Sequence, residues 1–223
     1  MQAKHIPLCL IKCLLWSGVS AALILENQEL QQRIRPQRVE FYSINFNNTL
    51  HWQPGRVGKG EDITYFVQYK VYGQSSWKNK EECWQIHEGL CDLTYETSDV
   101  REPYYSRVKS VSAGVHSNWT ISCRFTPWRE TIIGPPSVTV TPRNRSITLK
   151  LKAPSSPYKR KKGSKISMAY FYHLLYQVFL INNLPNEHIK QWKMTCLTGC
   201  SCKVETYICG HLLALSSKVT NRS

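Results

Sequence analysis

Acidic residues are scarce in the second half of this 223-residue sequence. Residues 135–223 contain two of them against 14 Lys and Arg, whereas residues 22–134 contain 13 of each sign, so the second half carries +12 of the formal net charge of +14. Acid–base catalysis needs positioned titratable groups, and the second half offers only two carboxylates. Motifs such as G-x-S-x-G, H-E-x-x-H and the phosphate loop are also missing, and the seven His are scattered singly. We therefore expect no enzyme and no cofactor.

Long apolar runs are absent after residue 22, since no later stretch reaches the roughly 18 residues that a membrane helix requires. Near the start, Lys4 and His5 precede an apolar stretch at 6–16, and small residues follow at 17–22. This order is typical of a secretory signal peptide, which we place at 1–21; a first core helix is the alternative. The mature chain is then secreted and extracellular. Four glycosylation sequons agree with export, at Asn47, Asn118, Asn144 and Asn221.

Seven of the nine cysteines lie beyond the predicted signal peptide. Cys83 and Cys91 enclose a short hydrophilic stretch, and a disulfide between them would brace a small loop. Cys123 has no evident partner. The crowded C-terminal group also has the spacing of a zinc site, but an oxidising route favours disulfides and paired C-x2-C knuckles are absent, so no metal site is predicted. That group, whose pairing stays open, consists of Cys196, Cys200, Cys202 and Cys209 with His211.

Alternating side chains indicate a series of short strands. Residues 64–72 alternate with a period of two residues, which places on one face Tyr65, Val67, Tyr69 and Val71. Shorter runs occur at 39–41, 50–52 and 146–151, while 170–181 is an apolar, aromatic-rich run that suits a buried strand. Because turn residues separate these runs and capped helical patterns are scarce, the sequence predicts an all-β protein built as a β-sandwich.

The chain also repeats itself after about 107 residues. The pattern Tyr65-x3-Tyr69-x-Val71 recurs as Tyr172-x3-Tyr176-x-Val178. Two tandem sandwiches of about 100 residues follow from this repeat. Paired prolines cannot continue a sheet, so we place a Pro-rich hinge between the two domains. The predicted boundaries are 36–130 for the first domain, 131–136 for the hinge and 137–223 for the second domain.

Two surface features suggest binding. Tyr72 stands at a strand end beside Gly73, where a large side chain can project from a loop tip as an anchor; packing of its ring on Trp77 is the alternative. The basic run 159–165 could attract heparan sulfate or an acidic cell surface, or it could be a solvated loop with no partner. Its cations are Lys159, Arg160, Lys161, Lys162 and Lys165.

Several segments resemble the ectodomains of the class II cytokine receptor family. The match covers roughly residues 36–183, and the segments that carry it are 36–39, 50–55, 65–73, 77–80, 83–84, 91–94, 102–105 and 124–128. The resemblance implies two fibronectin type III sandwiches, ligand held by loops and no catalysis. Beyond about residue 184 the likeness fades, so we expect a divergent tail and a second sandwich that lacks recognisable final strands.

The resemblance also implies where a ligand would bind. Tyr72, Gly73 and the following Gln74 fall in the family's first-domain binding loop. Another binding loop corresponds to the segment Ala113, Gly114, Val115, His116 and Ser117. The segment 157–168 corresponds to a second-domain loop, but here the chain departs from the family because 159–165 contain no acidic residue.

Two main hypotheses of function follow. The first is a secreted decoy that binds interleukin-22, or a related helical cytokine of the interleukin-10 type, and withholds it from the membrane receptor. The second is a glycosaminoglycan-binding matrix module driven by the basic second domain, which added salt would weaken steeply. A protease cofactor is a weaker third possibility, since paired sandwiches can scaffold an enzyme.

Overall fold

The computed structural model describes residues 24–56, 58, 60, 62–143, 146–181, 191–197, 201–205 and 212–214. At 143, 146 and 147, and in the described segments beyond 176, the description is of the backbone alone. The predicted signal peptide at 1–21 lies outside the described residues. The chain separates into two compact units, of which the first holds residues up to Tyr42 and Asn48–Pro127, and the second holds Ser43–Asn47 and Trp128–Ser223.

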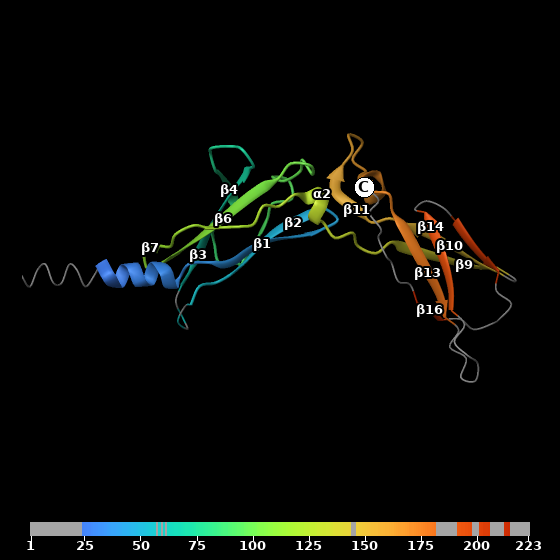
Figure 1. Ribbon diagram of the computed structural model, residues 1–223, viewed down its shortest axis with the longest axis horizontal. Helices are drawn as coiled ribbons and strands as arrows, with labels where there is room; N and C mark the ends of the chain where they lie inside the picture. Colours follow the sequence, from blue (N-terminus) through green and yellow to red (C-terminus); the bar gives the residue numbers. More distant parts are fainter. Residues whose placement is uncertain are drawn as a thin grey trace, which may run out of the picture. The chain divides into compact units, whose positions relative to one another are not determined.

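The first unit contains two antiparallel sheets, and Figure 1 labels most of their strands. The smaller sheet has the order β1-β2-β5, formed by β1 (Gln37–Ile44), β2 (Asn47–Gln53) and β5 (Leu90–Asp92). The larger has the order β4-β3-β6-β7, with β8 also paired to β6. Its strands are β3 (Thr64–Val71), β4 (Lys78–Ile86), β6 (Tyr104–Ser112), β7 (Val115–His116) and β8 (Thr120–Ile121).

Alternating side chains from both sheets form the core of the first unit. Strand β6 buries every second residue over its nine positions, which is the pattern of a strand with one face in the core. The predicted inward residues Tyr65 and Val67 are buried, and Tyr69 packs against the same cluster. The cluster also includes Val39, Leu50, Trp52, Ile63, Leu93 and Val108. A sandwich of two sheets, as predicted, is thus present in this unit.

A helix at 24–33 leads into the first unit. The residue that follows, Ile34, is fully buried, and its carbonyl accepts a hydrogen bond from the Ser110 hydroxyl at 2.6 Å. Gly55 is required beside this segment, because a Cβ there would lie 2.3 Å from the Arg33 carbonyl oxygen. The chain before β1 is therefore part of the first unit.

The second unit contains two three-stranded sheets and a hairpin. One sheet has the order β15-β10-β9 and the other β14-β13-β16. The bounds are β9 (Ser137–Arg143), β10 (Ser146–Lys152), β13 (Leu175–Ile181), β14 (Gln191–Leu197), β15 (Ser201–Glu205) and β16 (Leu212–Ala214). The hairpin is formed by β11 (Ser155–Lys159) and β12 (Lys165–Ser167), and the helices are α2 (Pro127–Glu130) and the 3-10 helix η1 (Met168–Tyr170).

The expected divergent tail contributes strands to this unit. Of the described segments beyond residue 184, β14 and β16 both pair with β13, while β15 pairs with β10. Within the described residues β16 has β13 as its single partner. The all-β fold with two sandwich units is confirmed. Strands of the tail pair with both sheets of the second unit.

The turn between β1 and β2 belongs to the second unit by its contacts. Phe46 is fully buried, with its ring centroid 4.9 Å from that of Phe171 and 5.8 Å from that of Tyr172. The backbone amide of Phe46 donates to the Thr131 hydroxyl at 2.9 Å. Residues Asn45 and Phe46 both have positive φ, of 51° and 66°, which makes the turn tight.

Candidate functional site

The loop after β3 presents Tyr72 to solvent. The ring is 57% exposed, and the backbone amide of Tyr72 donates to the Pro103 carbonyl at 2.8 Å. Gly73 has a φ of 85°, a conformation that glycine adopts without steric cost and that turns the chain directly after Tyr72. The Gln74 amide then donates back to the Val71 carbonyl at 3.2 Å. A rigid turn therefore carries an exposed aromatic side chain.

Two neighbours flank the Tyr72 ring. The Tyr105 ring centroid lies 6.2 Å away, and the guanidinium carbon of Arg124 lies 5.9 Å from the Tyr72 ring centroid. Arg124 is itself exposed. Tyr72, Tyr105 and Arg124 form what we call the Tyr72 cluster. This end of the first unit is also the one from which the chain leaves, since Phe125 pairs with Tyr104 at the start of β6.

Trp77 has other partners than Tyr72. Its ring lies 4.9 Å from the Lys70 ammonium and 4.3 Å from the Arg107 guanidinium. Arg107 also lies 4.5 Å from the ring of Trp119, which completes an alternation of cations and aromatic rings on the large sheet. The alternative in which the Tyr72 ring packs on Trp77 is therefore not the arrangement observed.

The segment Ala113–Ser117 lies at the opposite end of the same strand pair. In the antiparallel register of β3 and β6, Val71 faces Tyr104 and Thr64 faces Val111. Tyr72 thus follows one end of the pair, and Ala113 follows the other, at a separation of about 25 Å for eight residues at about 3.3 Å each. The two predicted binding segments do not come together.

Local contacts explain the form of that second segment. Ala113 and Gly114 have φ of 48° and 78° and turn the chain from β6 into β7 (Val115–His116). Ser117 is buried, and its hydroxyl accepts from the Ser110 amide at 2.9 Å. The Gln31 side chain donates to the His116 carbonyl at 2.9 Å, so the chain's own N-terminal helix covers part of this end.

The basic run lies at the tip of the hairpin formed by β11 and β12. Its two ends are joined by the Arg160 amide, which donates to the Ser164 carbonyl at 2.9 Å. Gly163, with a φ of 82°, makes the turn. All five cations of the run are exposed, and the Arg160 guanidinium lies 5.9 Å from the ring of Tyr170, which is 71% exposed. The segment 157–168 is thus a defined hairpin rather than an open loop.

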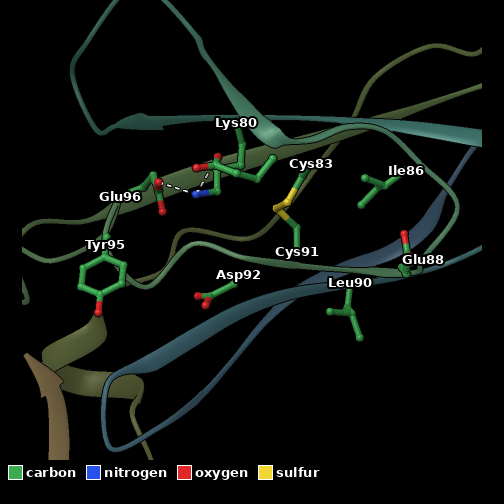
Figure 2. Close-up of a pocket in the computed structure, with 10 residues that line it drawn as sticks. Lys80, Cys83, Ile86, Glu88, Leu90, Cys91, Asp92, Tyr95 and Glu96 are labelled. Carbon is green, nitrogen blue, oxygen red and sulfur yellow. Dashed lines mark hydrogen bonds and ion pairs between the residues drawn. A yellow bond between two sulfur atoms is a disulfide. The ribbon is translucent and has the colours of Figure 1, made fainter.

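A disulfide joins Cys83 to Cys91, as predicted. Cys83 lies on β4 and Cys91 on β5, so the bond connects the two sheets of the first unit. Both sulfur-bearing residues are buried, and they form one wall of a cavity of about 510 Å³ that is drawn in Figure 2.

An ion-pair network lies at the edge of this cavity. The Lys80 ammonium is 2.6 Å from Glu96 and 3.1 Å from Glu82, and Figure 2 shows the two contacts as dashed lines. Burial lowers the pKa of Lys80, but its hydrogen bonds to the two carboxylates outweigh this and leave the pKa raised. The pKa of the exposed Glu82 is lowered, by its own backbone amide first and then by Lys80. Lys80 therefore stays charged.

The remaining predicted sites are distributed as follows. Asn47 and Asn118 are exposed, while Asn144 and Asn221 lie outside the described residues. Cys123 is exposed and free. The side chains of the four C-terminal cysteines are not among those described, and the described residues contain no group of three or more metal-ligating side chains. Within the same residues, no helix is long and apolar enough to cross a membrane.

The sequence did not point to Tyr105 or Arg124. The alternation of residues 104–112 would have placed Tyr105 on the outer face of a strand, but pairing with β3 was needed to bring it to Tyr72. Arg124 carries no local signal, because it reaches the Tyr72 ring through the pairing of Phe125 with Tyr104.

The fold and the site together are typical of a receptor that has two β-sandwich units and an exposed aromatic loop. The chain belongs to the class II cytokine receptor family. Residues 9–119 match the family model described as "Tissue factor", and residues 131–198 match "Interferon-alpha/beta receptor, fibronectin type III".

Among its relatives, interleukin-22 receptor subunit alpha-2 of Homo sapiens is 41% identical over 215 residues, with 82% of this chain and 80% of that protein covered. The Mus musculus protein of the same name is 44% identical, with 87% and 82% covered. A solved structure of the chicken interferon gamma receptor alpha chain shares the fold, with a TM-score of 0.56, 20% identity and coverage of 79% of this chain and 83% of that one.

Proposed function

We propose that this chain is a secreted decoy receptor that binds interleukin-22, or a related helical cytokine, and blocks its access to the membrane receptor. The relatives named as interleukin-22 receptor subunit alpha-2 support this, because they are matched over 80% and 82% of their lengths. The human interleukin-20 receptor subunit alpha, by contrast, is matched over 29% of its length. The family is non-enzymatic, and neither it nor the relatives support heparan sulfate as the partner.

The observation that carries the proposal is the exposed Tyr72 ring on a turn fixed by Gly73. A large aromatic residue that is exposed in the free protein and rigidly held has little ordering entropy left to lose on binding. Arg124 beside it adds a cation that can pair with a carboxylate of the ligand. We assign cytokine contact to the Tyr72 cluster together with Gly73 and Gln74.

Ala113–Ser117 is not included in the proposed site. A contact at both ends of the β3–β6 pair would have to span about 25 Å along one edge of the sandwich. In addition, Gln31 and the buried Ser117 hydroxyl already hold this segment to the rest of the first unit. Its residues serve the structure of that end.

The mechanism of a decoy is competition. A receptor that covers the surface which the cytokine offers to its membrane receptor lowers the free cytokine by mass action. For this to operate, the chain has to reach the medium. We propose cleavage of the signal peptide near residue 21 and an N-linked glycan on the exposed Asn47, both of which mass spectrometry of the secreted protein can detect.

The test is the capture of interleukin-22 by Tyr72→Ala. Truncation of a buried aromatic anchor typically costs about 2 kcal/mol or more, which is roughly a thirtyfold loss of affinity. Tyr72→Phe keeps the ring and should retain most of the binding, and His116→Ala, at the other end, should bind like the parent. Affinity is measured by surface plasmon resonance on protein collected from medium.

The thermal melting of each variant separates binding from folding. Because the Tyr72 ring is mostly exposed, Tyr72→Ala should be secreted and should melt within a few degrees of the parent. Parental affinity of Tyr72→Ala would remove the cluster from the site. A loss of binding in His116→Ala, with its melting unchanged, would instead move the site to the other end.

A further inference from the structure

The cavity beside the disulfide is lined in part by apolar residues, two of which are exposed. Its walls include the Cys83–Cys91 bond and Ile86. Leu90 and Tyr95 also line the cavity and are labelled in Figure 2; they are 49% and 66% exposed. Exposed large apolar side chains around a hollow are typical of an interaction surface.

Carboxylates dominate the charge around this cavity. Glu82, Glu88 and Asp92 line it and are exposed, and the one cation among its lining residues, Lys80, is already paired with Glu96 and Glu82. Residues 22–134 have no net charge, so this is a local concentration rather than the average of the unit. The cavity therefore suits a ligand surface that is basic and carries an exposed apolar group.

This chain contains such a surface on its second unit. The tip of the β11–β12 hairpin has five exposed cations between Lys159 and Lys165 and no acidic residue. Two backbone hydrogen bonds close the turn, from the Arg160 amide to the Ser164 carbonyl and from the Gly163 amide to the Arg160 carbonyl, at 2.9 and 2.8 Å. Tyr170, which is 71% exposed, lies under the Arg160 guanidinium. A rigid basic tip thus carries an aromatic group.

We propose that the hairpin tip of one copy docks into the acidic cavity of a second copy. The charges are complementary, and Leu90 and Tyr95 give Tyr170 an apolar surface to contact. The two surfaces differ, so the contact is of the heterologous kind, in which one copy uses its tip and the other its cavity. This association does not depend on cytokine binding.

The predicted association is weak and sensitive to salt. Both surfaces are solvent-exposed, so their charges are screened over about 8 Å at physiological ionic strength and about 3 Å at 1 M salt. Sedimentation velocity of the full secreted chain, at rising concentration and low salt, should show a concentration-dependent increase in mean size. The same series in 1 M salt should sediment as a monomer.

Charge reversal on each surface provides the specific test. Glu88→Lys is chosen for the cavity, because Glu82 holds Lys80 and Asp92 accepts the Thr94 amide at 2.9 Å. Lys161→Glu with Lys162→Glu is chosen for the tip. Each variant alone should associate at least about tenfold more weakly than the parent, because Glu88→Lys reduces the net charge of the cavity lining from −3 to −1 and the tip changes reduce that of the tip from +5 to +1.

The two variants should recover association when mixed, because the unchanged tip of the cavity variant then meets the unchanged cavity of the tip variant. A chain that carries both changes has neither intact surface and should associate no better than either variant alone. Matched controls for net charge are Glu40→Lys on β1 and Lys150→Glu with Lys152→Glu on β10, all at exposed positions outside the two surfaces. These should behave like the parent.

The outcomes decide the proposal. A parent that sediments as a monomer at every concentration at low salt overturns it, as does association that survives both reversals. If both reversals weaken the association but the mixture fails to recover it, the two surfaces do not contact each other and the proposal is wrong. Recovery in the mixture confirms it, and unchanged capture of interleukin-22 by Glu88→Lys keeps it separate from the proposed function.

Discussion

Loss of the Cys83–Cys91 disulfide should destabilise the first unit substantially. The bond joins β4 of the large sheet to β5 of the small one, across a sequence separation of 8 residues. For a closed loop of about nine residues, the chain-entropy relation gives about 2.6 kcal/mol at 25 °C. That is a large part of the roughly 5–15 kcal/mol by which a typical domain is stable.

The perturbation is the double replacement Cys83→Ala and Cys91→Ala. Both residues are at most 6% exposed and belong to the core cluster, so the loss of packing adds to the entropic loss. We expect a decrease of about 3 kcal/mol in the free energy of unfolding of the first unit. The matched control is Cys123→Ser, which replaces an exposed free thiol and should leave stability unchanged.

Urea denaturation of the secreted protein provides the measurement, followed through the fluorescence of Trp52, which lies in the core of the first unit. The midpoint should shift to lower urea with little change in slope. If the free energy of unfolding of the double variant lies within about 0.5 kcal/mol of that of the parent, the disulfide does not stabilise the first unit.

Two further predictions concern the same unit. Burial raises the pKa of Tyr104 to about 12. Between pH 10 and 12 the Tyr104 hydroxyl therefore loses its proton in the unfolded chain but keeps it in the folded chain. The free energy of unfolding should fall by about 2–3 kcal/mol over this range. In Tyr104→Phe, this decrease in the free energy of unfolding between pH 10 and 12 should be absent. The variant should lose about 1 kcal/mol at pH 7, because the hydrogen bond to the Asp99 carbonyl is missing. Urea midpoints at pH 7 and from pH 10 to 12 test both effects. Trp77→Ala should cost about 1–2 kcal/mol through its contacts with Lys70 and Arg107, and a midpoint equal to that of the parent would contradict a stabilising role for those contacts.

Features with local chemistry could be predicted from the sequence. The Cys83–Cys91 pair needs only a short loop and an oxidising compartment, and the Tyr72 turn needs only a strand end followed by glycine. Both are present as expected.

The inward face of β3 could be predicted only in part. Tyr65 and Val67 are buried and Tyr69 packs against the same cluster, as a period of two residues predicts. Val71 is half-buried and lies outside that cluster, and Phe66, on the other face, is buried with its ring against Trp84.

Features that depend on strand register could not be predicted in this way. The antiparallel pairing of β3 and β6 places Tyr72 and Ala113–Ser117 at opposite ends of the strand pair, which the sequence alone does not show. Cytokine contact by Ala113–Ser117 stays a prediction. Arg124 reaches the Tyr72 ring across 52 positions of sequence, through a bridge between Phe125 and Tyr104. A single sequence contains no signal for such pairings, because each is fixed by the packing of the whole sandwich.

The turn Ser43–Asn47 means that the second unit is not a continuous piece of chain. Its cluster of Tyr158, Phe171 and Tyr172 closes around Phe46, a residue encoded more than 80 positions before Trp128, where the rest of the unit begins. A chimera that joins Trp128–Ser223 to the first domain of another receptor would therefore contain these three rings but would lack the Phe46 ring that they surround. Such a chimera would need an aromatic residue at the position of Phe46 in its first domain. The second unit therefore cannot be combined with any first domain that lacks such a residue.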